Sequence, residues 1–182
     1  EKKNQMAFIW NYMTMDRTMK NTQEELNKFI YQGIVDLILH EVGHTLGLRH
    51  NFRASSVYSV EQLSDSIFTR NNGTASSVMD YNPANTFDNG DTFFLTKPGK
   101  YDFWAIEYAY STCEDYNDEE TCLKDIMSKS TDPQLTYATD EDTNWGNPDP
   151  LTNRYDMSSD PIKYYSKYLD MIQVYWENLL DE

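Results

Sequence analysis

The amino-acid sequence predicts a mainly α-helical fold, because two long segments carry apolar residues at helical spacing. The first segment runs from Thr22 to about Leu46 and repeats apolar residues every three to four positions. The second begins at Asp160 and continues to near Leu180. The chain shows no internal repeat and no sharp break in composition, so we expect a single domain over residues 1–182.

Terminal signals set the limits of the long helix. Thr22 followed by Glu25 matches a capping box at its beginning. Gly47 is expected to end it, since glycine adopts the left-handed conformation without strain. Residues 6–19 upstream also favour a helix, because apolar side chains recur there at helical spacing.

The remaining segments predict shorter helices joined by irregular chain. Helices are expected over residues 101–110 and 119–127, and Pro161 suits the first turn of the last helix. We interpret residues 51–76 as a polar connection with a turn signal at Asn71-Asn72-Gly73, and residues 77–100 as an irregular loop. Residues 131–160 are rich in Asp, Asn, Pro and Thr and show weak periodicity. We therefore expect a helical and irregular C-terminal subdomain.

Composition excludes two classes of partner. The formal net charge is −15, which argues against nucleic acid, since phosphate binding needs a basic surface. No run of 18 apolar residues occurs, so no transmembrane segment is expected. Residue 1 is Glu, which suggests a processed or excised piece of a longer precursor. The two cysteines, Cys113 and Cys122, could form a disulfide or remain free thiols, and their spacing alone does not decide.

The candidate chemistry lies in one string that runs from His40 to His50 and reads HEVGHTLGLRH. On a helix, His40 and His44 project from the same face one turn apart, so two imidazoles can hold one cation such as zinc. Glu41 lies beside them and could take a proton from a metal-activated water. A sharp exit at Gly47 would return His50 as a third ligand, leaving the fourth position open, as in catalytic zinc sites.

Chance is a poor explanation for this string. Three fixed residues of a bare HExxH recur about once in 8,000 starts, and the added Gly47 and His50 reduce that to about one in 3 million. The chain contains 3 histidines, and all of them belong to the motif. The alternative of hydrogen-bonded core histidines therefore has little weight.

HExxHxxGxxH is the signature of the metzincins, and the sequence resembles this clan of zinc metallopeptidases in a second place. Ser77-Val78-Met79-Asp80-Tyr81 is similar to the S-x-M-x-Y Met-turn of astacins and serralysins. The resemblance implies that Met79 forms an apolar floor beneath the zinc. It also implies that Tyr81 contacts the metal or stabilises an oxyanion, for which a phenol is a suitable donor. Ordinary core packing of Met79 and a structural role of Tyr81 are the alternatives.

The resemblance is closer to the Met-zincin family of large, mostly bacterial, predicted secreted metalloproteases. It covers nearly all of residues 34–170 and rests on HEVGHTLGLRHNFRAS, SVMDYNPAN, KYDFWAIEYAY, TDED and SDPIKYY. It implies a zinc-dependent endopeptidase with one catalytic Zn²⁺, a peptide or protein substrate, and an extracellular or periplasmic location. It implies no substrate specificity, and Asn51 after the third histidine separates the chain from the better-known families.

One departure from the clan pattern keeps a rival hypothesis open. Metzincins place a twisted sheet before the active-site helix, whereas the 39 residues before His40 do not predict one. We therefore expect a fragment of an α+β catalytic domain that lacks its N-terminal sheet subdomain. The rival is an inactive binding or assembly module, with structural or lost zinc, whose partners are the rest of its precursor or other chains. A gluzincin, with a distant Glu as third ligand, is a weaker alternative.

A further candidate metal site rests on acidic residues alone. Carboxylates are frequent in the C-terminal third of the chain, and calcium prefers such oxygen ligands. No EF-hand spacing is present, so solvated loop carboxylates are the favoured interpretation and Ca²⁺ the alternative. The residues concerned are Asp140, Glu141, Asp142, Asp149, Asp156 and Asp160.

Overall fold

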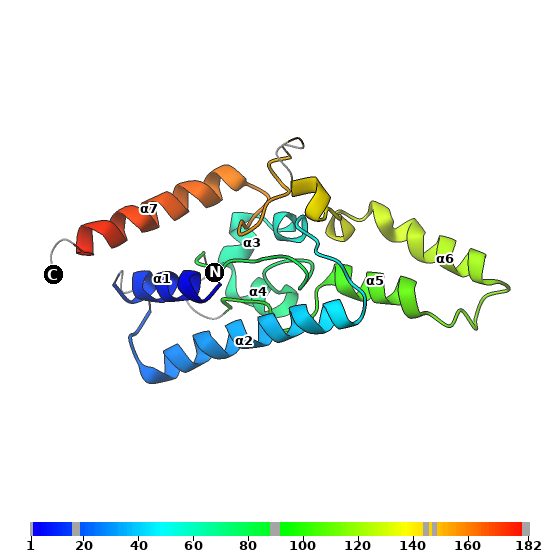
Figure 1. Ribbon diagram of the computed structural model, residues 1–182, viewed down its shortest axis with the longest axis horizontal. Helices are drawn as coiled ribbons and strands as arrows, with labels where there is room; N and C mark the ends of the chain where they lie inside the picture. The colour runs from blue at the N-terminus through cyan, green and yellow to red at the C-terminus, as the bar shows by residue number, and fades with distance from the viewer. Residues whose placement is uncertain (1, 16–18, 88–91, 144–145, 147–148, 180–182) are drawn as a thin grey trace.

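The computed structural model describes residues 2–15, 19–87, 92–143, 146 and 149–179 (Figure 1). Within these ranges the protein is mainly α-helical and contains no strand, which confirms the predicted fold class. None of the described helices is long and apolar enough to cross a membrane.

Helix α2, Gln23–Thr45, is the longest helix and matches the predicted one. The Thr22 hydroxyl accepts a hydrogen bond from the Glu25 amide at 3.3 Å, which satisfies one of the unpaired donors at the helix start. The helix ends where expected, because Gly47 adopts a φ of +86°. The active-site string therefore occupies the last turns of α2 and the loop beyond them.

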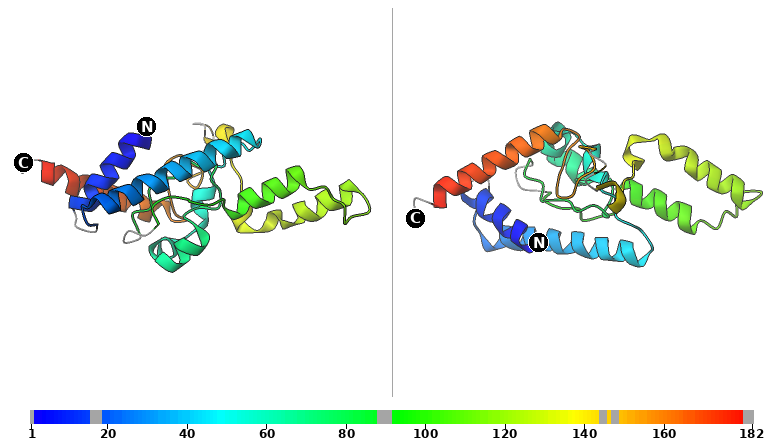
Figure 2. Two further views of the ribbon diagram at one scale, coloured as in Figure 1. Left: turned by 90° about the horizontal axis from the view of Figure 1, so that it is seen from below. Right: turned by 45° about the horizontal axis from the view of Figure 1, so that its top comes forward.

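A buried apolar cluster joins α2 to helices α1, Lys2–Met15, and α7, Pro161–Leu179. Figures 1 and 2 show α1 beside the N-terminal half of α2, and α7 lies on the opposite side of α1. Phe29 of α2 lies within this cluster, and Phe8 packs edge-on to Tyr175 at 5.1 Å between ring centroids. Both helices were predicted, and α1 begins about four residues earlier than expected, while residues 16–18 of the expected helix lie outside the described residues.

The polar connection over residues 51–76 contains helices that the sequence analysis did not predict. It contains a 3₁₀ helix, Ala54–Val57, and two short helices, α3, Val60–Ser64, and α4, Ser66–Asn72. Local capping explains α3 and α4, since Ser59 and Asp65 accept hydrogen bonds from their first-turn amides. The predicted turn at Asn71-Asn72-Gly73 marks the end of α4, where Gly73 has a φ of +83°.

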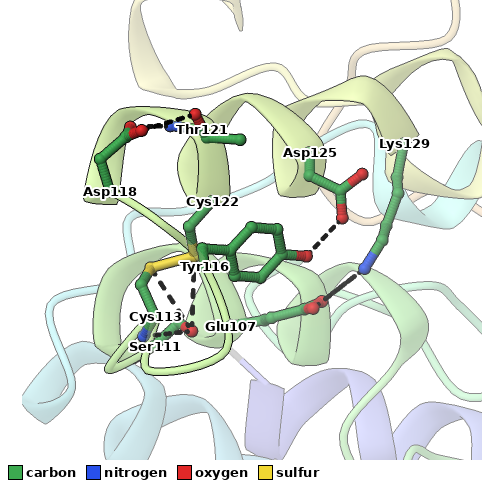
Figure 3. Close-up of a disulfide and its surroundings, with 9 residues drawn as sticks. All are labelled: Glu107, Ser111, Cys113, Tyr116, Asp118, Thr121, Cys122, Asp125 and Lys129. Carbon is green, nitrogen blue, oxygen red and sulfur yellow. Dashed lines mark hydrogen bonds and ion pairs between the residues drawn. A yellow bond between two sulfur atoms is a disulfide. The ribbon is translucent and has the colours of Figure 1, made fainter.

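Helices α5, Lys100–Tyr110, and α6, Glu119–Ser128, form a hairpin that projects from the rest of the molecule (Figures 1 and 2). A disulfide between Cys113 and Cys122 closes the loop between them, with Cα atoms 5.8 Å apart (Figure 3). The indole of Trp104 donates to the Ile126 carbonyl at 2.8 Å, and Lys129 pairs with Glu107 at 2.9 Å. The question left open by the cysteine spacing is thus answered by a disulfide.

The segments expected to be irregular are so in the described residues. Residues 77–87 and 92–99 form no helix, and residues 129–143 contain three short 3₁₀ helices, Lys129–Thr131, Pro133–Leu135 and Asp140–Thr143. Val78 and Asp140 of these segments contact His40 and His50. Phe93 and Phe94 instead donate through their amides to Gln32 of α2.

Candidate metal centre

The three histidines of the string meet at the C-terminal end of α2. His40 and His44 are one turn apart on the helix, and the loop opened by Gly47 returns His50 to them. One ring nitrogen from each histidine lies within 4.8 Å of the other two. Three imidazole nitrogens so close together fit a single zinc ion and leave room for further ligands.

Backbone carbonyls orient the two helical imidazoles. His40 Nδ1 lies 2.7 Å from the Val78 carbonyl oxygen, and His44 Nδ1 lies 3.0 Å from the Leu48 carbonyl oxygen. A carbonyl can only accept, so each Nδ1 must carry the proton and donate it. The Nε2 atoms then keep their lone pairs, which is the tautomer that a metal requires.

A carboxylate performs the same task for the third imidazole. His50 Nδ1 donates to Asp140 Oδ2 at 2.9 Å, and Arg154 contacts the other carboxylate oxygen at 3.1 Å. The bond from His50 holds the pKa of Asp140 below its usual range, so the carboxylate stays ionised near neutral pH. From the sequence, Asp140 was interpreted as a solvated loop carboxylate, with a calcium ligand as the alternative, and its contact with His50 was missed.

The buried histidine is poised in its neutral form. Burial lowers the pKa of His40, and the neighbouring His44 and His50 lower it further, although the bond to Val78 opposes them. An uncharged imidazole is the form that binds a metal. His40 therefore loses little through competition with protons at neutral pH.

The segment from Ser77 to Tyr81 passes directly beneath the histidine-bearing turn of α2. Met79 is fully buried, and a Cβ atom at Gly43 would overlap the Met79 sulfur. The Asn51 amide donates to the Met79 carbonyl at 3.0 Å, which joins the chain just after His50 to this segment. Only a glycine at position 43 permits so close an approach.

One cavity of about 300 Å³ brings the predicted site residues together. Its lining includes the three histidines and both residues expected to act in catalysis. The full lining set is Asp36, Leu37, His40, Glu41, His44, His50, Asp80, Tyr81, Asn82 and Tyr155.

A model of the Met-zincin family matches residues 22–182. The chain belongs to the Met-zincin family. No curated protein and no solved structure matches the chain. The histidine cluster agrees with the zinc-dependent chemistry that the family name implies, because its donors are all nitrogen atoms at suitable separations.

In this Met-zincin a buried aspartate of α5 holds the segment under the histidines. Asp102 accepts hydrogen bonds from Ser77 Oγ at 2.6 Å, the Val78 amide at 2.9 Å and the Gly99 amide at 2.7 Å. Burial nevertheless raises the pKa of Asp102, because these bonds only partly offset the loss of water. The sequence analysis missed this residue, since no spacing rule relates it to the histidines 52 to 62 positions earlier.

Two stacked tyrosines form the wall of the cavity opposite α2. The Tyr81 ring centroid lies 4.8 Å from that of His50 and 5.4 Å from that of His40. Tyr155 stacks on Tyr81 at 5.6 Å, and its amide donates to the Tyr81 carbonyl at 3.1 Å. Tyr155 also has a φ of +63°, a conformation that is rare outside glycine and costs about 1–3 kcal/mol. The contact of the Tyr81 hydroxyl with a metal or a substrate stays a prediction.

A pair of buried carboxylates lies next to these tyrosines in the chain. Ser55 donates through its amide to Asp80 at 2.9 Å and through its hydroxyl to Asp156 at 2.9 Å. Burial, followed by the charge of Asp156, raises the pKa of Asp80 well above its ordinary value. Burial also raises the pKa of Asp156 to about 6. Burial thus favours the protonated form of both carboxylates, and the pair links the segments that carry Tyr81 and Tyr155.

The calcium hypothesis finds no support. Among the described residues, the histidine cluster is the one group of three or more potential side-chain ligands that lie close enough to hold an ion. The acidic residues have other partners: Asp140 contacts His50, Glu141 pairs with Arg49, and Asp149 pairs with Arg53. Backbone amides or Ser55 hold the others, Asp142, Asp156 and Asp160.

Proposed function

We propose that the protein is a zinc-dependent endopeptidase that hydrolyses peptide bonds at the His40–His44–His50 centre. The observation that carries this proposal is the single cavity lined by three metal-binding imidazoles, Glu41 and Tyr81. Glu41 supports a catalytic rather than a purely structural site, because a structural zinc needs no free carboxylate beside its ligands.

The roles follow from the chemistry of the side chains. Bound zinc would polarise the scissile carbonyl and lower the pKa of a water molecule. Glu41 would take the water proton and pass it to the leaving amine. Tyr81 would donate a hydrogen bond to the oxyanion that develops on the substrate. Met79 would act as an apolar floor beneath the ligands, as in a Met-turn.

The Glu41→Gln variant tests the enzyme hypothesis. It should keep the zinc content of the wild type, measured by elemental analysis, because Glu41 is not a ligand. It should lose about 10²–10⁴-fold in hydrolysis of a peptide mixture, because the general base is gone. Unchanged turnover would refute the role of Glu41, and absence of hydrolysis by the zinc-loaded full-length protein would refute the peptidase itself.

The His50→Ala variant tests the ligand set. It should lose most of the zinc affinity if three imidazoles hold the metal. Full zinc affinity in this variant would instead favour a gluzincin-like arrangement with a distant third ligand.

We also infer that the protein acts outside the cytosol, in an extracellular or periplasmic compartment. The Cys113–Cys122 disulfide supports this inference, because such bonds persist in oxidising environments. Secretion of the full-length product into the medium or periplasm, followed by mapping of the disulfide, would test it.

A further inference from the structure

Helix α7 carries two rows of large apolar side chains, and only one of these rows is buried. In the buried row, Met171 packs in the cluster that contains α1, and Tyr164 packs in the cluster that contains Leu63 of α3. Figure 1 shows α7 along the edge of the molecule. The other row is exposed, with values from 41% to 79%, and consists of Ile162, Tyr165, Leu169, Ile172 and Trp176. We call this exposed row the α7 seam.

The α7 seam has the spacing of a helix–helix interface. Its members are separated by three, four, three and four residues, which is the 3.5-residue repeat of paired helices. Side chains at this spacing form a continuous stripe that can interlock with the stripe of a second helix. Contiguous exposed apolar surface of this kind marks an interaction site. The seam therefore suits a partner helix with a similar stripe.

The area of the α7 seam is sufficient for association. Taking about 200 Å² for a large side chain, the five residues expose roughly 600 Å². Two seams that face each other would bury up to roughly 1,200 Å², which is the lower end of the range of stable interfaces. Two copies of the seam can thus form an interface without help from another surface.

The charges along α7 are self-complementary in one orientation. Lys163 lies near the beginning of the seam, and Asp170 and Glu177 follow it at intervals of seven residues on the same flank. In two antiparallel copies, Lys163 of each copy would face Glu177 of the other, whereas parallel copies would bring the acidic ends together. Lys163 also lies 3.2 Å from Glu61 and 3.8 Å from Asp160, but such exposed pairs are weak and leave its charge available. The charge pattern favours a second copy of the chain in antiparallel orientation.

A groove at the beginning of the seam can receive one side chain of the second copy. It has a volume of about 390 Å³ and lies between Pro150 and the seam residues Ile162 and Tyr165. Antiparallel alignment of two seams about their centre places Trp176 of one copy beside Ile162 and Tyr165 of the other, at this groove. Trp176 is 63% exposed, and tryptophans that fill a pocket of the partner often dominate the energy of an interface.

We propose that the α7 seam joins two copies of the chain into an antiparallel dimer, with Trp176 of each copy seated in the groove of the other. The proposal is independent of the peptidase function, because none of the seam residues lines the cavity at the histidines.

Sedimentation equilibrium of the full-length protein measures the association. The wild type should form a dimer between about 1 and 100 μM, and Leu169→Asn and Trp176→Ser should each raise its dissociation constant at least tenfold, because each removes a large apolar contact. Ile67→Asn is the matched control, since Ile67 is 67% exposed, close to the 65% of Leu169, but lies on α4. Because the three side chains are exposed, all variants should keep the circular dichroism spectrum of the wild type.

Cross-linking tests the orientation of the two copies. Ser166→Cys and Gln173→Cys place thiols on one flank of the seam, at positions that come together between antiparallel copies but not between parallel ones. A bismaleimide should therefore give more cross-linked dimer from a mixture of the two variants than from either variant alone. The native cysteines are joined in a disulfide and do not react with the reagent.

Three outcomes would overturn the dimer proposal. A wild type that stays monomeric at about 100 μM would show that the seam does not bind a second copy at this strength. Equal dissociation constants for Leu169→Asn and Ile67→Asn would place a dimer interface elsewhere on the molecule. A mixture that cross-links no better than the single variants would refute the antiparallel arrangement.

Discussion

Replacing Asp140 with Ala should weaken zinc binding by about 10- to 100-fold, or about 1.4–2.7 kcal/mol. The carboxylate accepts the Nδ1 proton of His50 at 2.9 Å and so fixes both the tautomer and the ring orientation of the third ligand. The Asp140 side chain is 41% exposed and also contacts Arg154, so solvent screens part of its charge. We therefore expect a loss near the tenfold end of the range.

A competition titration against a chromophoric zinc chelator at pH 7 measures this loss. Asp140→Asn should fall between the wild type and Asp140→Ala, because its amide oxygen can still accept the His50 proton without the charge. Glu141→Gln is the matched control, since Glu141 lies in the same 3₁₀ helix but pairs with Arg49 at the surface. Equal zinc affinity of Asp140→Ala and Glu141→Gln would refute the orienting role of Asp140.

Three further predictions concern the surroundings of the metal. Tyr81→Phe should lower kcat by about 10- to 1,000-fold with zinc content unchanged, because it removes a transition-state donor, and unchanged kcat would contradict that role. Gly43→Ala should lower the free energy of unfolding by about 1–3 kcal/mol, because the alanine methyl group would overlap Met79. Thermal melts of the metal-free protein measure this loss, and an unaltered Tm would contradict the packing of Met79 against Gly43. Asp156→Asn should flatten the pH dependence of stability in urea titrations. With a folded-state pKa of about 6, Asp156 alone contributes about 3 kcal/mol of stability that is lost as pH rises from about 4 to 6, because the folded state holds a proton that the unfolded chain releases. An equally steep fall in the variant would assign the proton elsewhere.

The local part of the metal centre could be predicted because helix geometry determines it. His40 and His44 share a face at a spacing of four residues, and Gly47 permits the turn that returns His50. The short helices α3 and α4 also carried local signals, since Ser59 and Asp65 are ordinary capping residues. Those signals were outweighed by the polar composition of the segment, and the helices were missed.

The long-range part of the site could not be predicted from spacing. Asp140 lies 90 residues beyond His50, and Asp102 lies 24 residues beyond Val78. Chain folding alone brings these groups together, and no periodic pattern relates them. The placement of Met79 under Gly43 was expected only through the resemblance of the Met-turn, because nothing in the helical period of α2 indicates it.

The orientation of the three imidazoles depends on three different segments, and this makes the metal centre sensitive to the fold as a whole. His44 is held by the loop that directly follows its own helix, through Leu48. His40 is held by the carbonyl of Val78, whose amide is in turn held by Asp102 of α5. His50 is held by Asp140, the first residue of the 3₁₀ helix Asp140–Thr143. A peptide of the string alone therefore has the ligands but lacks two of the three acceptors that fix their tautomers. High zinc affinity consequently requires the 77–80 segment, α5 and residues 140–143 to be folded onto α2, so metal binding and tertiary structure should stabilise each other.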